Sequence, residues 1–239
     1  MSRRLLATLI AASAPVLAAA AARAQPTPEP PLTAFSAHYT ADWKSINVGT
    51  SDLVFMPDGA SRFLYTWTIT ARGIFRLIYP NDVVQRSWLS VADDHVRPDR
   101  YRAGDGNSTV NIDFDWDALH ASGSSETKPV SLKLTDGTQD VMSIQIEVML
   151  DLKNGKVPAT FRILDKNEIK DFLYTDEGPA RLRTALGDLD TVVVSSRRAG
   201  NNRVLRMWFA PSLGYVPVQA ERSRDGRLEF AMRIKSLNR

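Results

Sequence analysis

The stretch Phe63-Leu64-Tyr65-Thr66-Trp67-Thr68-Ile69-Thr70 decides the fold of this chain. Large apolar side chains occupy every odd position, and threonine occupies three of the four even positions. Successive side chains on a strand point to opposite faces, so this period of two predicts a β-strand with one buried face. Residues 110–116, 130–135 and 228–235 repeat the pattern. Such alternation is typical of antiparallel sheets, because parallel strands buried on both faces read as continuous apolar runs.

Turn signals separate the alternating stretches and predict many strands. Pro57-Asp58-Gly59, Asp136-Gly137 and Asp225-Gly226 fit hairpin or loop chemistry. Further strands are expected at 36–43, 46–56, 83–91, 159–164, 169–175, 180–186, 189–198, 203–210 and 215–222. We therefore expect a mainly β fold, a strongly curved antiparallel sheet or barrel of about 11–13 strands with one or two short helices.

Two stretches do not fit this strand pattern clearly. Arg72 to Tyr79 places large apolar residues where a short helix or lid could bury them. Residues 139–153 fit a strand by their period of two. They also fit a helix capped by Asp140, with Met142 and Ile146 on its buried face. Propensity slightly favours the strand, and both alternatives stay open at this point.

The N-terminus has the parts of a secretory signal peptide. Arg3 and Arg4 precede an apolar stretch that ends in Ala22-Arg23-Ala24. A membrane anchor is the alternative, but Pro15 interrupts the stretch and no stop-transfer pattern follows it. We expect cleavage after Ala24 and a periplasmic protein. Its disordered tether would cover residues 25–34, and a single β-rich domain would cover residues 35–239.

Charge and cysteine content exclude several classes of function. The whole chain has 30 basic and 27 acidic residues, and the expected signal peptide holds three of the arginines and no acid. The exported part is then neutral, so net charge gives no support for nucleic-acid binding. The chain contains no cysteine, which excludes disulfides, zinc–thiolate and Fe–S sites, cysteine nucleophiles and lipoprotein attachment. We expect no cofactor and a monomer.

Catalytic and metal-binding motifs are absent or weak in the sequence. Asp113, Asp115 and Asp117 alternate with Phe114 and Trp116. Their spacing along a strand is too wide for adjacent carboxylates to chelate one ion, so a wet outer face is the simpler interpretation. The three histidines lack metal-ligand spacing, and neither a G-x-S-x-G nucleophile motif nor a P-loop is present. No catalytic or metal residue is therefore assigned. The basic cluster at 97–102 is interpreted as a solvated strand, with an anion site as the alternative.

Aromatic and basic side chains make the better candidates for a ligand site. Tryptophans on predicted strands could line the concave face of a curved sheet and bind a lipid chain or a sugar ring. Residues 73–79 could cover that concavity as a lid that meets amphiphiles or a membrane surface. The candidate ligand-binding residues are Trp67, Trp88, Trp116, Phe75, Arg76 and Tyr79. An ordinary filled core is the alternative to a ligand cavity.

Four short stretches carry a resemblance to a known family. They are Tyr39 with Val48-Gly49, Ser87-Trp88 with Arg97-Pro98-Asp99-Arg100-Tyr101, Asp115-Trp116 with Gln139-Asp140 and Ser143, and Trp208-Phe209-Ala210-Pro211 with Tyr215-Val216-Pro217-Val218. In this order and spacing the chain resembles, from about Phe35 to Ser236, bacterial exported proteins of the domain of unknown function 3108 family.

The resemblance implies an envelope protein with a curved antiparallel sheet, similar in architecture to the lipoprotein-carrier-like half-barrels of the periplasm. It also implies that Gln139-Asp140 opens a helix over 140–152, although Ile144, Ile146 and Val148 are poor helix formers. The family offers no catalytic residues to carry over.

These observations lead to one preferred function and two alternatives. We expect a periplasmic, non-enzymatic binding or carrier protein for an amphiphile or glycan held in the sheet's concavity. The first alternative is an envelope hydrolase or lyase that uses carboxylates such as Asp113, Asp115 or Asp140. The second is a structural or assembly partner of another envelope protein.

Overall fold

The computed structural model describes residues 32–239, apart from Ala60, Asp93 and Asn107. The expected signal peptide, its cleavage site and most of the tether lie outside the described residues. Within the described part, no helix has the length and apolar character needed to cross a membrane.

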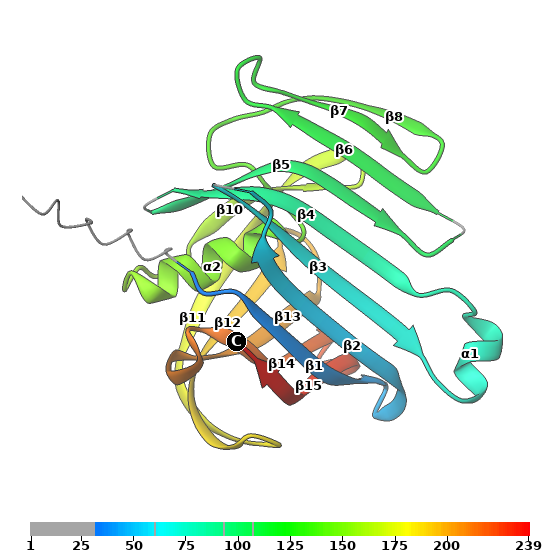
Figure 1. The fold of residues 1–239 in the computed structure, drawn as a ribbon, viewed down its shortest axis with the longest axis vertical. Helices are drawn as coiled ribbons and strands as arrows, with labels where there is room; N and C mark the ends of the chain where they lie inside the picture. Colours follow the sequence, from blue (N-terminus) through cyan, green and yellow to red (C-terminus); the bar gives the residue numbers. More distant parts are fainter. Residues whose placement is uncertain (1–31, 60, 93, 107) are drawn as a thin grey trace, which may run out of the picture.

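The described chain forms one continuous sheet of 15 strands (Figure 1). The strands are β1 (Phe35–Trp43), β2 (Ile46–Pro57), β3 (Arg62–Ala71), β4 (Val83–Ala92), β5 (His95–Gly104), β6 (Thr109–Asp115), β7 (His120–Ser125), β8 (Lys128–Lys133), β9 (Gln139–Asp140), β10 (Thr160–Asp165), β11 (Glu168–Thr184), β12 (Gly187–Arg198), β13 (Arg203–Ala210), β14 (Val216–Arg224) and β15 (Arg227–Asn238). The helices are α1 (Ile74–Ile78), α2 (Ser143–Lys153) and the 3-10 turn η1 (Pro211–Leu213).

Two antiparallel meanders make up the sheet. Strands β1 to β8 follow one another on one side, and β15 back to β10 follow one another on the other, with β1 and β15 paired at the junction. The two-residue β9 adds a parallel pair with β10 at the far edge. The expectation of a mainly β, strongly curved antiparallel sheet is therefore confirmed.

The strand count is higher than expected, and the differences have local causes. Strand β7 has the sequence His-Ala-Ser-Gly-Ser-Ser, which contains no large apolar side chain to show alternation. Strand β9 is held to two residues by its pairing with β10. Strand β11 is one long strand where two were expected, because a bulge between Asp176 and Gly178 bends the chain without ending its pairing with β12.

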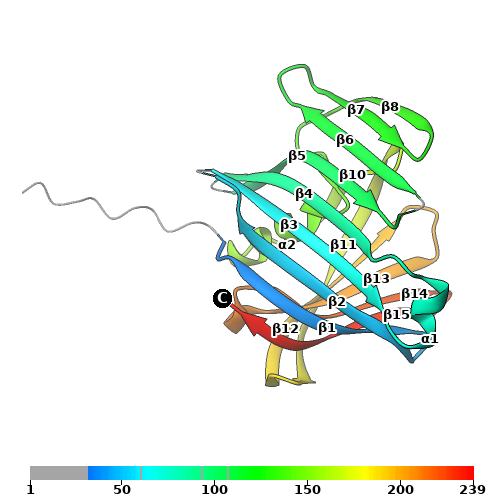
Figure 2. The same cartoon turned by 45° about the vertical axis from the view of Figure 1, so that its right-hand side comes forward.

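Helix α2 lies inside the curve of the sheet. Figures 1 and 2 show the strands bending around it, and it packs against β5 and β9. Nine of its eleven residues are buried, including Ile144, Ile146 and Val148. The helix expected from the resemblance is thus confirmed. Burial on all sides outweighs the weak helix propensity of these β-branched residues.

The core fills the sheet's interior around α2. Phe55 stacks on Phe63 with ring centroids 4.7 Å apart, and fully buried Tyr65 meets the Phe55 ring edge-on. The Tyr39 hydroxyl donates to the Pro217 carbonyl oxygen at 2.6 Å, which ties the first meander to the second. The part of the concave side near α1 is not filled in this way.

Candidate functional site

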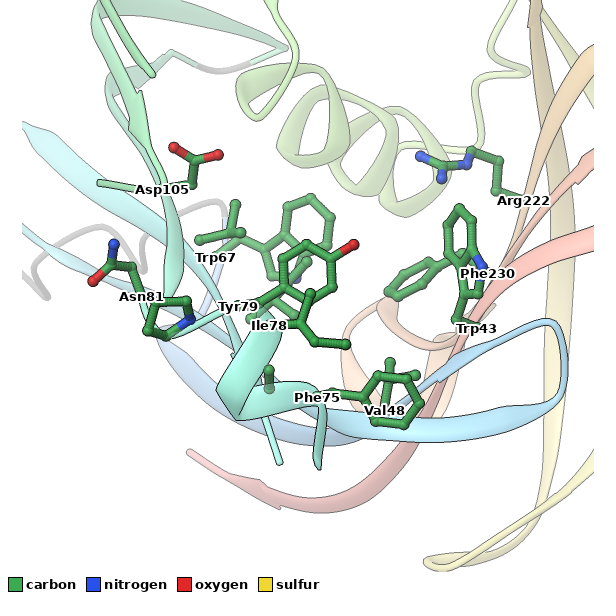
Figure 3. Close-up of a pocket in the computed structure, with 14 residues that line it drawn as sticks. Trp43, Val48, Trp67, Phe75, Ile78, Tyr79, Asn81, Asp105, Arg222 and Phe230 are labelled. Atoms are coloured by element: carbon green, nitrogen blue, oxygen red, sulfur yellow. The ribbon is translucent and has the colours of Figure 1, made fainter. Parts of the chain in front are cut away.

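A cavity of about 570 Å³ opens on the concave side of the sheet, at the end where α1 lies (Figure 3). Its walls come from β1 to β4, α1, the connection after β5, and the two strands β14 and β15. The lining residues are Trp43, Val48, Trp67, Ile69, Ala71, Phe75, Ile78, Tyr79, Pro80, Asn81, Val83, Asp105, Arg222 and Phe230. All but three of them are apolar or aromatic, so the cavity is mainly apolar.

Strand β3 shows how alternation builds the cavity wall. Its inward side chains run from buried Tyr65, in the core, through Trp67 and Ile69 to Ala71, which line the cavity. The same face of one strand therefore passes from filled interior to open cavity. The Trp67 indole Nε1 donates to the Ser51 hydroxyl at 2.6 Å, so the polar atom of this ring is already paired within the wall.

Helix α1 and its flanks close one side of the cavity. Gly73, with φ 57°, lets the chain turn out of β3, and the Arg72 backbone N–H donates to the Val48 carbonyl oxygen at 2.9 Å. Phe75, Ile78 and Tyr79 then face the cavity (Figure 3). Phe75 is half-buried, whereas the rest of the helix is exposed to solvent.

Arg222 places a cation at the wall opposite α1. Its guanidinium lies 5.9 Å from the ring centroids of both Trp43 and Phe230, and it points toward the cavity in Figure 3. The Arg222 Nε lies 3.4 Å from a Glu229 carboxylate oxygen but donates no hydrogen bond within the described part of the chain. Burial lowers the pKa of Arg222, which nevertheless stays charged at any physiological pH.

Glu229 has a second arginine partner besides Arg222. Its carboxylate also lies 3.1 Å from the Arg203 Nε. Although partial desolvation acts in the other direction, the neighbouring arginines hold the pKa of Glu229 below its usual value. Two arginines thus share one carboxylate, which leaves positive charge at the cavity wall.

Asp105 and Asn81 form the polar side across from Arg222. The Asp105 carboxylate accepts the backbone N–H of Ser108 at 2.8 Å, so it holds the turn between β5 and β6. Gly106 in that turn packs closely on Asn81, because a Cβ atom there would lie 2.3 Å from the Asn81 Nδ2. The β5–β6 turn and the segment after α1 therefore seal this corner of the cavity together.

Three of the six predicted ligand-binding residues line the cavity, namely Trp67, Phe75 and Tyr79. Arg76 lies on α1 but does not line the cavity, and its guanidinium pairs with Asp82 instead. Trp88 and Trp116 also lie outside the cavity.

Trp88 lies on the convex face of β4, where Arg100 covers its ring at 5.5 Å. Trp116 lies on the concave side, but at the opposite end of β6 from the cavity. There it stacks on Phe114 and donates its indole N–H to the Pro98 carbonyl oxygen at 2.7 Å. The prediction that these two tryptophans line a common concavity with Trp67 is therefore corrected.

The sequence interpretation missed Trp43, Arg222 and Phe230. A signal for Arg222 exists in β14, where Val216, Val218 and Ala220 are buried. Arg222 continues this apolar register at the same spacing of two. In this chain, an arginine in phase with a buried face is the sequence signal for this wall of the cavity.

The acidic residues considered for catalysis lie elsewhere. Asp113 is exposed and paired with Arg102 at 2.7 Å, and Asp115 accepts the Ala118 backbone N–H. Asp140 is fully buried at the start of α2. None of these carboxylates lines the cavity. Within the described residues, no group of three or more His, Asp or Glu side chains could hold a metal ion.

Asp140 has a structural environment of its own. One carboxylate oxygen accepts the backbone N–H groups of Met142 and Ser143, and the other accepts the Ser87 hydroxyl at 2.6 Å. Burial raises the pKa of Asp140 to about 6, and these hydrogen bonds act in the opposite direction. This carboxylate holds the first turn of α2 against β4.

Comparison with solved structures finds a similar fold at low sequence identity. A β-barrel-like protein of the domain of unknown function DUF1849 from Brucella abortus matches with a TM-score of 0.55 and 11% identity, over 87% of this chain and 98% of that chain. At this identity the likeness concerns the fold alone.

Two further structures match at lower scores. A protein from Parabacteroides distasonis described as a lipoprotein has a TM-score of 0.38 and 11% identity, covering 87% of this chain and 97% of that chain. A protein from Bacteroides fragilis described as exported, with a YmcC-like fold, has a TM-score of 0.34 and 10% identity, covering 86% of this chain and 94% of that chain.

Sequence comparison gives a more direct assignment than these structures. Among curated proteins, no sequence matches this chain. One family model matches most of this chain, and the matched region includes the four short stretches on which the resemblance rests. The chain belongs to the family described as protein of unknown function DUF3108, which matches residues 38–231.

Proposed function

We propose that this protein is an extracytoplasmic binding or carrier protein for an amphiphile with an anionic end. The observation that carries the proposal is the cavity of about 570 Å³ beside α1. Its volume falls within the range of about 300–1,000 Å³ that is common for small-molecule sites. An open apolar cavity in a sheet whose remaining interior is packed is costly unless a ligand uses it.

An apolar chain fits this cavity better than a glycan does. Trp43, Trp67, Ile69 and Phe230 present rings and aliphatic groups, and the Trp67 indole N–H is already paired with Ser51. A glycan would need several free donors and acceptors to replace its hydration. Each methylene group transferred from water to such walls contributes about 0.8 kcal/mol to binding.

Arg222 is the reason to expect a ligand with a negative charge. Its guanidinium points toward the cavity beside two aromatic rings, while its Nε faces the Glu229 carboxylate at 3.4 Å. Guanidinium groups bind carboxylates and phosphates through parallel hydrogen bonds. A carboxylate or phosphate at one end of an acyl chain would satisfy the guanidinium while the chain occupies the apolar space.

The N-terminal sequence supports the extracytoplasmic location. Two arginines, an apolar stretch and the Ala22-Arg23-Ala24 site form an export signal. The cavity's preference for amphiphiles fits a compartment bounded by membranes. No nucleophile–base pair lines the cavity among the described residues, so binding is proposed in preference to catalysis.

A titration with two matched probes tests the proposal. The probes are a fluorescent long-chain fatty acid and its methyl ester, which differ only in the charge of the head. We expect saturable binding of both probes to the wild type. Ala71→Trp, which adds an indole to the cavity, should lower the affinity for both probes by tenfold or more. Thr68→Trp adds the same ring to the outer face of β3 and should change neither.

The charge of the head is tested by variants of Arg222. Arg222→Gln should lower the affinity for the fatty acid roughly tenfold and leave the affinity for the ester unchanged. The reason is that one charge-assisted hydrogen bond contributes about 1.5–3 kcal/mol. Arg222→Lys should retain part of the preference for the acid. Equal affinities of wild type and Ala71→Trp would rule out the cavity as the site. Equal losses of acid and ester in Arg222→Gln would rule out the anionic end.

A further inference from the structure

We infer that the cavity end of the protein docks on the surface of an anionic lipid bilayer. This inference concerns the outer surface around the cavity mouth rather than the cavity itself. It adds to the proposed function a place where the ligand would be exchanged. The tip surface is defined here as the exposed ends of three neighbouring connections, at residues 43–47, 72–82 and 224–227.

Large apolar side chains gather on the tip surface. Trp43, Ile46, Ile74, Leu77, Ile78 and Tyr79 are 43%, 59%, 69%, 83%, 63% and 63% exposed. They make up half of the twelve exposed large apolar residues in the described part of the chain. Single exposed apolar residues are normal on a protein surface, but a cluster of this kind marks an interaction site.

The three connections lie together at one end of the sheet. The Arg72 backbone N–H donates to the Val48 carbonyl oxygen, which joins the α1 segment to β2. The Lys44 backbone N–H donates to the Glu229 carbonyl oxygen at 3.0 Å, which joins the β1–β2 turn to β15. Figures 1 and 2 show α1 at the same end of the sheet as the turn between β1 and β2.

The tip surface is continuous with the cavity. Trp43, Ile78 and Tyr79 line the cavity and are exposed at the same time. Ile74 and Leu77 of α1 do not line the cavity and are exposed to solvent. An amphiphile that leaves a bilayer against this surface would pass from lipid to apolar wall without crossing open water.

The charge around the tip surface complements an anionic membrane. Lys44, Arg72, Arg224 and Arg227 are all exposed there. With Arg76, these connections hold five basic residues and two acids, Asp82 and Asp225. Asp82 pairs with Arg76, and Asp225 accepts a hydrogen bond from the neutral Asn202 side-chain amide and keeps its charge. The tip therefore carries excess positive charge, although the expected exported chain has none overall.

This combination favours a bilayer over a protein partner. Aliphatic and aromatic side chains that project from a short helix, with basic residues beside them, suit insertion at the headgroup boundary of an anionic leaflet. Tryptophan and tyrosine, both present on this tip, are enriched at that boundary.

Vesicle co-sedimentation of the purified exported protein tests the inference. The vesicles are phosphatidylcholine alone or phosphatidylcholine mixed with phosphatidylglycerol. We expect the wild type to bind the mixed vesicles and to lose binding as salt is added. The double variant Ile74→Glu/Leu77→Glu should lower binding tenfold or more. The matched control is Val157→Glu, because Val157 is 67% exposed near Asp94 at the opposite end of the sheet, and it should bind like wild type.

Two further arms separate the competing explanations. Arg72→Gln/Arg224→Gln should reduce binding to mixed vesicles and leave any binding to neutral vesicles unchanged. Ala71→Trp should still bind vesicles even if it no longer binds the fatty acid. Docking on the membrane and binding of the ligand are therefore tested independently. Unchanged vesicle binding of Ile74→Glu/Leu77→Glu would overturn the inference. So would a wild-type dimer that this variant converts to a monomer, since the tip would then be a self-interface.

Discussion

Glu147 lies on α2, where that helix packs on the start of β5. Its side chain is 8% exposed, and its carboxylate accepts the Val96 backbone N–H. The pKa of Glu147 is raised to about 7, mainly by burial and to a smaller extent by nearby Asp151, while the Val96 hydrogen bond acts in the opposite direction. The folded protein therefore binds a proton at Glu147 at a pH where the unfolded chain has lost it.

This shift predicts a stability that falls as pH rises. Below the ordinary pKa of 4.5 the carboxyl is protonated in both states, and above about 7 the folded protein must hold a buried charge. Glu147→Gln removes the ionisation. Its free energy of unfolding, from urea titrations, should gain about 1–2 kcal/mol over wild type between about pH 5 and pH 8. Asp117→Asn, in the exposed turn after β6, serves as the control. A difference between wild type and Glu147→Gln that stays constant with pH would refute the assignment.

Individual site residues were predictable only where the inward face of their strand was known. Trp67 belongs to the clearest alternating stretch, and Phe75 and Tyr79 belong to one of the two stretches that did not fit the strand pattern. Trp88 was misplaced because its neighbour Ser87 faces inward instead, held there by its hydrogen bond to Asp140. That contact joins residues 53 positions apart, and no local pattern reveals it.

At the scale of an element, α2 depends on its first turn. Asp140 accepts two backbone N–H groups at the start of the helix and the Ser87 hydroxyl from β4. Asp140→Ala would leave these three donors buried without partners, and each such donor costs about 1–3 kcal/mol. We predict a loss of roughly 3–5 kcal/mol in the free energy of unfolding.

The conservative variant provides the contrast for this prediction. Asp140→Asn keeps an acceptor oxygen for the helix amides, so it should lose about 1–2 kcal/mol at most. Both variants should retain the fatty-acid affinity of wild type under conditions where they are folded, because Asp140 does not line the cavity. If Asp140→Ala is as stable as wild type, the carboxylate is not what fixes α2.

The identity of α2 shows where local sequence information ends. Its alternating isoleucine and valine residues fit a strand as well as a helix, and only the family resemblance favoured the helix. The segment is buried between β5 and the second meander, so its surroundings are apolar on nearly every side. Periodicity therefore carries no information about its conformation, and the hydrogen bonds that Asp140 accepts from Met142 and Ser143, together with the enclosing sheet, decide it.

At the scale of the whole molecule, alternation predicted a curved antiparallel sheet, and the sheet is as expected. The sequence could not show which part of the interior stays open. That depends on α2, which lies within the curve of the sheet but contributes no residue to the lining of the cavity at the α1 end. The cavity wall then combines residues from both ends of the chain, such as Trp43 and Phe230, which the pairing of β1 with β15 places opposite each other.

The central claim is that this cavity holds an amphiphile with an anionic end. Native mass spectrometry of the protein purified from its own host tests the claim most directly. We predict that the wild type carries the added mass of an acidic lipid, which collisional activation releases as an anion, and that Ala71→Trp carries much less of it. A wild-type spectrum that shows only the mass of the bare chain would contradict the account.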